Sequence, residues 1–89
     1  MFVLVCTDKP DSRELRAANR QAHLDYADST GVVFLGGPFL DGDGNMTGSL
    51  IILDVSDMAA AEAWAAADPY AKAGLFETVT IRAWKKVRG

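Results

Sequence analysis

The sequence is poor in the residues that build cross-links, metal sites and nucleic-acid surfaces. Its one cysteine, Cys6, allows no disulfide within the chain, which fits a reducing compartment. Its one histidine, His23, has no partner at a metal-ligand spacing, so we expect no metal site. The net charge is −3, and the basic residues cluster only at positions 85–88. Binding to nucleic acid is therefore not expected, because phosphate contacts need an array of Lys and Arg.

Long apolar runs are also missing. None approaches the roughly 20 residues that span a bilayer, so no membrane partner is expected. Residues 1–6 are apolar, but they lack the basic start of a signal peptide and soon reach Asp8 and Pro10, which predicts a strand. Cys6 within this run is interpreted as a small buried residue, since nothing near it in sequence would lower its pKa for a nucleophilic role. We predict a cytoplasmic protein with a single domain, residues 1–89.

The elements that are present alternate in a recognisable order. β-prone runs predict strands at 2–7, 32–40, 47–55 and 77–84, while residues 12–30 and 58–67 have helical patterns. The order βαββαβ predicts an α+β, ferredoxin-like fold, with a four-stranded antiparallel sheet and two main helices on one face. Strands 2–7 and 47–55 are too apolar for a face in contact with water. We therefore predict that a second copy covers the open sheet face, in a homodimer of the dimeric α+β-barrel type.

Both predicted helices have an apolar side and a start signal. In helix 12–30, one stripe at helical spacing is predicted to face the sheet: Leu15, Ala18, Ala22 and Tyr26. Either Asp11 or Ser12 is expected to cap this helix, and Gly31 to end it. Ser56 is expected to cap the alanine-rich helix 58–67.

The most informative stretch follows this second helix. Pro69 disfavours helical geometry at Asp68, so a break is predicted there. The Asp68 carboxylate can then cap a short new turn, with Pro69 in its first position and Gly74 at its end. Taken alone, Asp68 is a helix cap. It is also an acidic side chain fixed at a kink.

His23 is the default general acid or base, because imidazole is the only side chain with an unperturbed pKa near neutrality. In a ferredoxin-like fold the ends of the two helices approach one region of the sheet, which permits a contact between His23 and Asp68. A carboxylate on the imidazole would fix its tautomer and raise its basicity. Both roles of Asp68 are compatible if one oxygen accepts from the backbone and the other from the imidazole.

Further polar residues form a candidate substrate-binding set, and each of them could instead have a purely structural role. Ser49 is expected near Gly37 and Pro38, where its hydroxyl and backbone N–H groups could bind an oxygen, or the hydroxyl could simply bond the backbone. Arg20 could hold a substrate anion or form a surface ion pair. Tyr70 could donate a proton or serve packing alone.

Five short motifs in order resemble the YciI-like, or YCII-related, family over nearly the whole chain: Arg20-Gln-Ala-His23-Leu24, Gly36-Gly37-Pro38, Thr47-Gly48-Ser49, Ala67-Asp68-Pro69-Tyr70 and Ala73-Gly74-Leu75. The resemblance implies a ferredoxin-like fold, a dimer and a pocket with a His–Asp pair, which matches His23 and Asp68. It also implies a serine near the pocket, matched by Ser49. One branch of the family is similar to enzymes that eliminate chloride from a chlorinated hydroxyquinol.

Two functions follow as hypotheses. The first is a small-molecule enzyme of lyase or hydrolase type, without a required cofactor, in which Asp68 orients His23 for elimination, isomerisation or hydrolysis of a small aromatic or carbonyl compound. The second is a non-catalytic homodimer that binds a small ligand or regulates through the same pocket. A purely structural dimer and a small α+β-barrel oxygenase are weaker alternatives, the oxygenase because His23 alone supplies few groups for its chemistry.

Overall fold

The computed structural model describes residues 1–89 and has the predicted α+β order. The elements are β1 (Phe2–Asp8), α1 (Arg13–Thr30), β2 (Val33–Leu40), β3 (Met46–Leu53), α2 (Met58–Ala67), α3 (Pro69–Lys72) and β4 (Phe76–Ala83). This confirms the ferredoxin-like βαββαβ fold, with strand ends shifted by one or two residues from the predicted ones. No helix is both long and apolar enough to cross a membrane.

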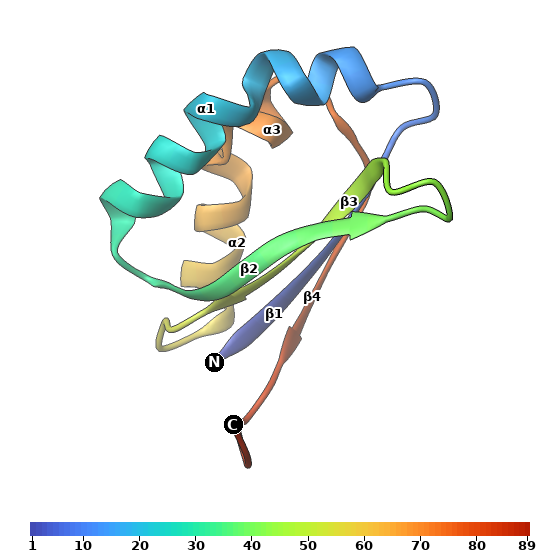
Figure 1. Cartoon of the computed structure of the whole chain (residues 1–89). Helices are drawn as coiled ribbons and strands as arrows, with labels where there is room; N and C mark the ends of the chain where they lie inside the picture. Colours follow the sequence, from blue (N-terminus) through green and yellow to red (C-terminus); the bar gives the residue numbers. More distant parts are fainter.

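The four strands form one antiparallel sheet in the order β2-β3-β1-β4. All three helices lie on the same face, and the opposite face is bare (Figure 1). Helix α1 contacts β2 and α3, whereas α2 contacts β1, β4 and α3. The two main helices therefore divide one sheet face between them.

The register decides which side chains enter the core. Leu4 of β1 is paired with Ile51 of β3 and Ile81 of β4, so these three lie on the helix-covered face. The buried core is Leu4, Cys6, Ile51, Leu53, Ala61 and Trp64. At Gly48, any Cβ would collide with the Cys6 carbonyl oxygen, so only glycine allows β1 and β3 to pair closely there.

The open face has an apolar centre. Val3 is paired with Ile52, and Val5 with Leu50, on the face that no helix covers. On the edge strand β2, Leu35 and Phe39 are 49% and 40% exposed. The apolar strands thus have the distribution that the sequence predicted, and the second chain that would cover them stays a prediction.

The predicted inner stripe of α1 is wrong. Leu15, Ala18 and Ala22 are exposed, and of that stripe only Tyr26 packs against the core. The helix turns a polar side inward instead, with Arg16 5% exposed. The apolar pattern misleads here because Arg16 has charged and polar partners that offset the cost of its burial.

Helix ends match the predictions only in part. Gly31 and Gly74 have left-handed φ angles of 68° and 75°, as expected for residues that end helices. Ser12 is the N-cap of α1 but makes no capping bond; its hydroxyl donates to the Pro10 carbonyl. In α2 the cap is Asp57 rather than Ser56, and its carboxylate accepts from the Ala60 N–H at 2.8 Å.

Candidate active site

Asp68 lies between α2 and α3 with an extended ψ of 126°, the break that Pro69 predicts. It is 1% exposed. Its Oδ1 accepts from the Tyr70 N–H at 3.0 Å and lies 2.7 Å from Nδ1 of His23. The predicted contact and the predicted cap are therefore both present. Contrary to the prediction, the two bonds are not divided between the two carboxylate oxygens, because Oδ1 alone takes both.

His23 comes from the middle of α1 and meets Asp68 across the gap between the helices. A carboxylate can only accept, so Nδ1 carries a proton, and in the neutral ring Nε2 has the free lone pair. Nε2 makes no hydrogen bond within the protein, yet no buried side-chain nitrogen or oxygen lacks a partner. Nε2 therefore reaches open space, and His23 lines a cavity there.

Arg16 is the site residue that the sequence analysis missed. Its Nε and Nη2 donate to the two oxygens of Asp8 at 2.7 and 3.0 Å, a two-pronged ion pair. The same Nη2 donates to Oγ of Ser49 at 2.9 Å. Burial lowers the pKa of Arg16, but its hydrogen bonds to Asp8 and the charge of Asp8 raise the pKa by more. The net shift is upward, so Arg16 stays a cation. The Ser49 hydroxyl thus bonds a side chain, and the expectation of a backbone bond is wrong.

Tyr70 lies between the two parts of the site. Its ring stacks on His23 with centroids 4.1 Å apart and an angle of 15° between the planes. On the same ring, the guanidinium carbon of Arg16 lies 4.6 Å from the centroid. Burial raises the pKa of the Tyr70 phenol above its usual value, and the charges of Arg16 and Arg20 offset only part of this rise. Tyr70 therefore packs the site and also lines its cavity.

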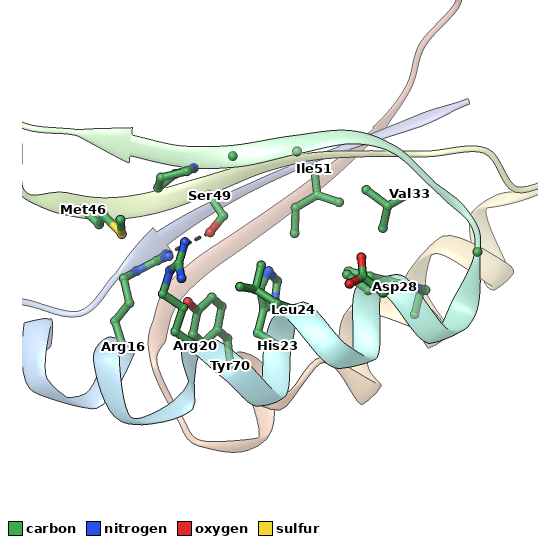
Figure 2. A pocket seen from close by; sticks show the side chains of 16 residues that line it. Arg16, Arg20, His23, Leu24, Asp28, Val33, Met46, Ser49, Ile51 and Tyr70 are labelled. Atoms are coloured by element: carbon green, nitrogen blue, oxygen red, sulfur yellow. Dashed lines mark hydrogen bonds between the residues drawn. The ribbon is translucent and has the colours of Figure 1, made fainter.

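These residues surround a cavity of about 360 Å³ between α1 and strands β2 and β3 (Figure 2). Its polar lining includes Arg16, Arg20, His23, Ser49 and Tyr70, and its apolar lining includes Leu24, Val33, Met46, Ile51 and Trp64. A pocket of this size and mixed lining suits a small organic molecule.

The remaining predicted site residues also reach this cavity. Gly37 and Pro38 line it, and Pro38 is paired with Ser49 across β2 and β3, as expected. Arg20 lines it too, and it takes part in neither of the two ion pairs of the protein, so the surface ion pair is excluded. Burial raises the pKa of Cys6 to about 12, so it is a thiol at neutral pH and no nucleophile.

The signal that could have revealed Arg16 is its spacing. Arg16 precedes His23 by seven residues, or about two turns, which places both on one side of α1. Asp8 is the last residue of β1 and precedes Arg16 by eight residues. The apolar stripe of α1 indicated one side of the helix as the inner side, but the inner side is the polar one that carries Arg16 and His23.

The fold and site together define a ferredoxin-like α+β protein with a buried His–Asp pair beside a cavity of about 360 Å³. The chain belongs to the YCII-related domain family, whose model matches residues 1–85. It is 38% identical to Protein YciI of Escherichia coli O6:H1 and of Shigella flexneri, over 98% of each chain. It is 32% identical to an uncharacterised protein of Haemophilus influenzae, over 97% of each chain.

Solved structures agree on the fold. The chain resembles 5-chloro-2-hydroxyhydroquinone dehydrochlorinase (TftG) from Burkholderia phenoliruptrix AC1100, in complex with 2,5-dihydroxybenzoquinone. The TM-score is 0.88 and the identity 32%, covering 94% of this chain and 92% of the other. A likeness to an antibiotic biosynthesis monooxygenase, with a TM-score of 0.61 and 14% identity over 99% and 100%, shows the shared fold alone.

Proposed function

We propose that this protein is a small-molecule enzyme of lyase type that eliminates a leaving group from a hydroxylated, single-ring compound. The observation that carries the proposal is the buried His23–Asp68 pair with Nε2 open to the cavity. Such a pair combines an oriented imidazole with a free lone pair at the cavity wall, which is what general base catalysis needs.

The substrate class is supported by the size and lining of the cavity and by the similarity to TftG. A cavity of about 360 Å³ with an apolar wall suits one aromatic ring, and the polar groups around His23 suit ring oxygens. TftG is a dehydrochlorinase with a quinone bound and the same fold at 32% identity. Elimination is therefore preferred here over isomerisation or hydrolysis.

The proposed reaction needs only proton transfer and a leaving group. Nε2 of His23 takes a proton from one ring hydroxyl and returns it to the ring carbon that carries the halogen, so that the ring becomes a keto form with one new C=O and one new C–H bond. Nε2 then takes the proton of a second ring hydroxyl: the electron pair of that O–H bond forms a second carbonyl, a ring double bond shifts, and the halide leaves with the electron pair of the carbon–halogen bond. Asp68 stabilises the imidazolium that forms, since its carboxylate stays bonded to Nδ1–H.

The direct test is release of chloride from 5-chloro-2-hydroxyhydroquinone by the purified protein. We expect turnover in the wild type and a loss of about 10²- to 10⁴-fold in kcat for His23→Asn, the contribution typical of a general base. Asp68→Asn should lower kcat as well, because it changes the tautomer of His23. Saturable binding of 2,5-dihydroxybenzoquinone that survives His23→Ala, without any turnover, would instead favour the non-catalytic binding protein.

The pair itself is tested by nitrogen NMR of the His23 ring. In the wild type, the proton of the neutral ring should lie on Nδ1, and Asp68→Asn should weaken that preference. If both proteins show the same distribution of tautomers, the catalytic pair has no basis. Because Asp68 also caps α3, the folded state of Asp68→Asn is checked by circular dichroism first.

We also propose that two copies pair through the open sheet face. Val3, Val5, Leu35, Phe39 and Leu50 form a contiguous apolar area on that face, which is unusual for a surface left in water. Analytical ultracentrifugation should show a dimer that Val5→Lys dissociates. A monomer at high protein concentration would contradict this.

A further inference from the structure

We infer that Met46 is a specificity-determining residue that confines the substrate to a single ring. Met46 lies between the cavity at His23 and a second, mostly polar hollow near the start of α1, and it lines both of them. The inference rests on the proposed function and adds the feature that excludes compounds with a second ring.

The second hollow is large enough to matter for a ligand. It has a volume of about 430 Å³, against about 360 Å³ for the cavity at His23. It is lined by Lys9 in the turn after β1, by Arg13 at the start of α1, and by Thr47 and Glu77 of the sheet. The cavity at His23 suits one ring, and the two spaces joined would suit two.

The wall between the two spaces has a rigid part and a flexible part. The rigid part is the buried ion pair of Asp8, which lines the hollow, and Arg16, which lines the cavity. The flexible part is Met46, which is half-buried and has an unbranched side chain with free rotation about its bonds. Figure 2 shows Met46 at the end of the cavity where Arg16 lies. Only the replacement of Met46 opens this wall without leaving a buried charge unpaired.

A β-bulge turns Met46 toward the cavity. Pro38 is paired with Ser49 on the helix-covered face, and Leu40, two residues further along β2, has the same face. The register shifts after Phe39, so that Leu40 is paired with Met46. Met46 therefore shares the face of Ser49, whereas in a regular strand these two positions would lie on opposite faces.

The hairpin loop before Met46 holds its backbone in place. One carboxylate oxygen of Asp41 accepts from the N–H groups of Asp43 and Asn45, at 2.9 and 3.0 Å. The side chain of Asn45 accepts from Nη1 of Arg13 at 2.9 Å, which ties the loop to the start of α1. Loop and strand pairing together fix the backbone of Met46, so the space beside it depends on the length of its side chain.

The consequence for specificity is a length limit. In the wild type, a ring beside His23 has room only as far as Met46, and a second ring in this direction collides with the methionine. Met46→Ala removes Cγ, Sδ and Cε and joins the two spaces, so that a second ring can enter the hollow. Such a collision costs affinity for the larger compound only, so Met46 discriminates by size.

The test compares 2,5-dihydroxybenzoquinone with its 3-phenyl derivative by isothermal titration calorimetry. The wild type should bind the one-ring compound about tenfold more tightly or better. In Met46→Ala the phenyl derivative should bind at least as tightly as the one-ring compound, because six additional carbon atoms in contact are typically worth about tenfold in affinity. Met46→Val is also shorter and suits a strand, and it should change the preference in the same direction. Equal affinities in the wild type, or an unchanged preference in both variants, would overturn the inference.

Two controls locate the effect. Met46→Leu keeps nearly the same side-chain volume and should keep the preference for one ring. Met58→Ala removes the same atoms from a methionine of α2 that is 37% exposed and lines neither space, and it should also keep the preference. The same loss in Met58→Ala would mean that general loosening of the protein, and not an open wall, admits the second ring.

The same measurements separate this inference from the proposed function. If chloride release depends on His23 while Met46→Ala and Met46→Val keep the wild-type preference, the length limit is wrong and the proposed reaction stands. If these variants admit the second ring and no chloride is released, the length limit stands and the proposed reaction fails. Binding of neither quinone to the wild type overturns the length limit, whatever the chloride assay shows.

Discussion

The two long helices cover the same sheet face, but α2 contributes to the core and α1 lines the cavity. Helix α2 is mostly alanine and places Ala61 and Trp64 in the core, close to β1 and β4. Helix α1 places Arg16 and His23 toward β2 and β3 and leaves a cavity beneath it. The small side chains of α2 pack directly in the core, whereas the long polar side chains of α1 line a cavity. The site therefore lies where apolar packing stops.

The first way to test this contrast is a leucine truncation on each side. Leu53→Ala removes a fully buried side chain from the core, which should cost about 3 to 5 kcal/mol in the free energy of unfolding. Leu24→Ala, at the cavity wall on α1, should cost about 1 kcal/mol, because its surroundings are already open. Urea denaturation of both variants gives the comparison. Equal losses would show that the side chains at the cavity wall pack as tightly as those in the core.

Enlarging an alanine on each helix is the converse experiment. Ala61 is 0% exposed, so Ala61→Leu should destabilise the protein by about 1 to 3 kcal/mol through overpacking. Ala22 on α1 is exposed, and Ala22→Leu should change stability by less than about 0.5 kcal/mol. Had Ala22 faced the sheet, as the apolar stripe predicted, both variants would be harmful.

The pH dependence of stability tests how dry the core is beside the site. Burial first, and then the charge of Asp68, raise the pKa of Cys6 from 9.0 to about 12. The folded protein therefore keeps its thiol proton at pH values where the unfolded chain loses it. This contribution to stability is complete below pH 9.0 and is lost as the pH rises toward 12.

At about one pH unit above the unfolded pKa the loss should reach about 1.4 kcal/mol. Denaturation at several alkaline pH values, for the wild type and Cys6→Ala, isolates this effect from that of the tyrosines. The variant should fall less steeply. Parallel curves would mean that water reaches Cys6.

The helix starts give the smallest contrast. Asp57 caps α2 through the Ala60 N–H, so Asp57→Ala should cost about 1 kcal/mol. Ser12 makes no capping bond at the start of α1, and Ser12→Ala should be close to neutral. Thermal unfolding monitored by circular dichroism measures both. A loss in Ser12→Ala as large as that in Asp57→Ala would show a capping bond in solution.

Much of this protein was predictable from local pattern. Strands, helix ends at Gly31 and Gly74, and the kink at Asp68 follow from backbone preferences that act within a few residues. The contact between His23 and Asp68 was predictable as an allowed one, since the βαββαβ order packs both helices on one sheet face, although His23 lies in the middle of α1 and not at its end. The family motifs pointed to the same two residues.

The inner side of α1 was not predictable in this way. The apolar stripe of Leu15, Ala18 and Ala22 suggested one side, and the structure buries another. Arg16 can be buried only because Asp8 and Ser49, at distant positions in the chain, are there to bond it. Partners that are far apart in sequence leave no trace in the helix's own pattern.

The sequence by itself determined the order of the elements, the breaks between them and the two residues that pair in the site. The tertiary structure alone decided that α1 turns Arg16 toward Asp8 and Ser49, and that the cavity opens beneath this helix rather than under α2. The physical reason is range. Backbone conformation is set by neighbouring residues, whereas burial of a charge depends on which partners the whole fold brings within hydrogen-bond distance.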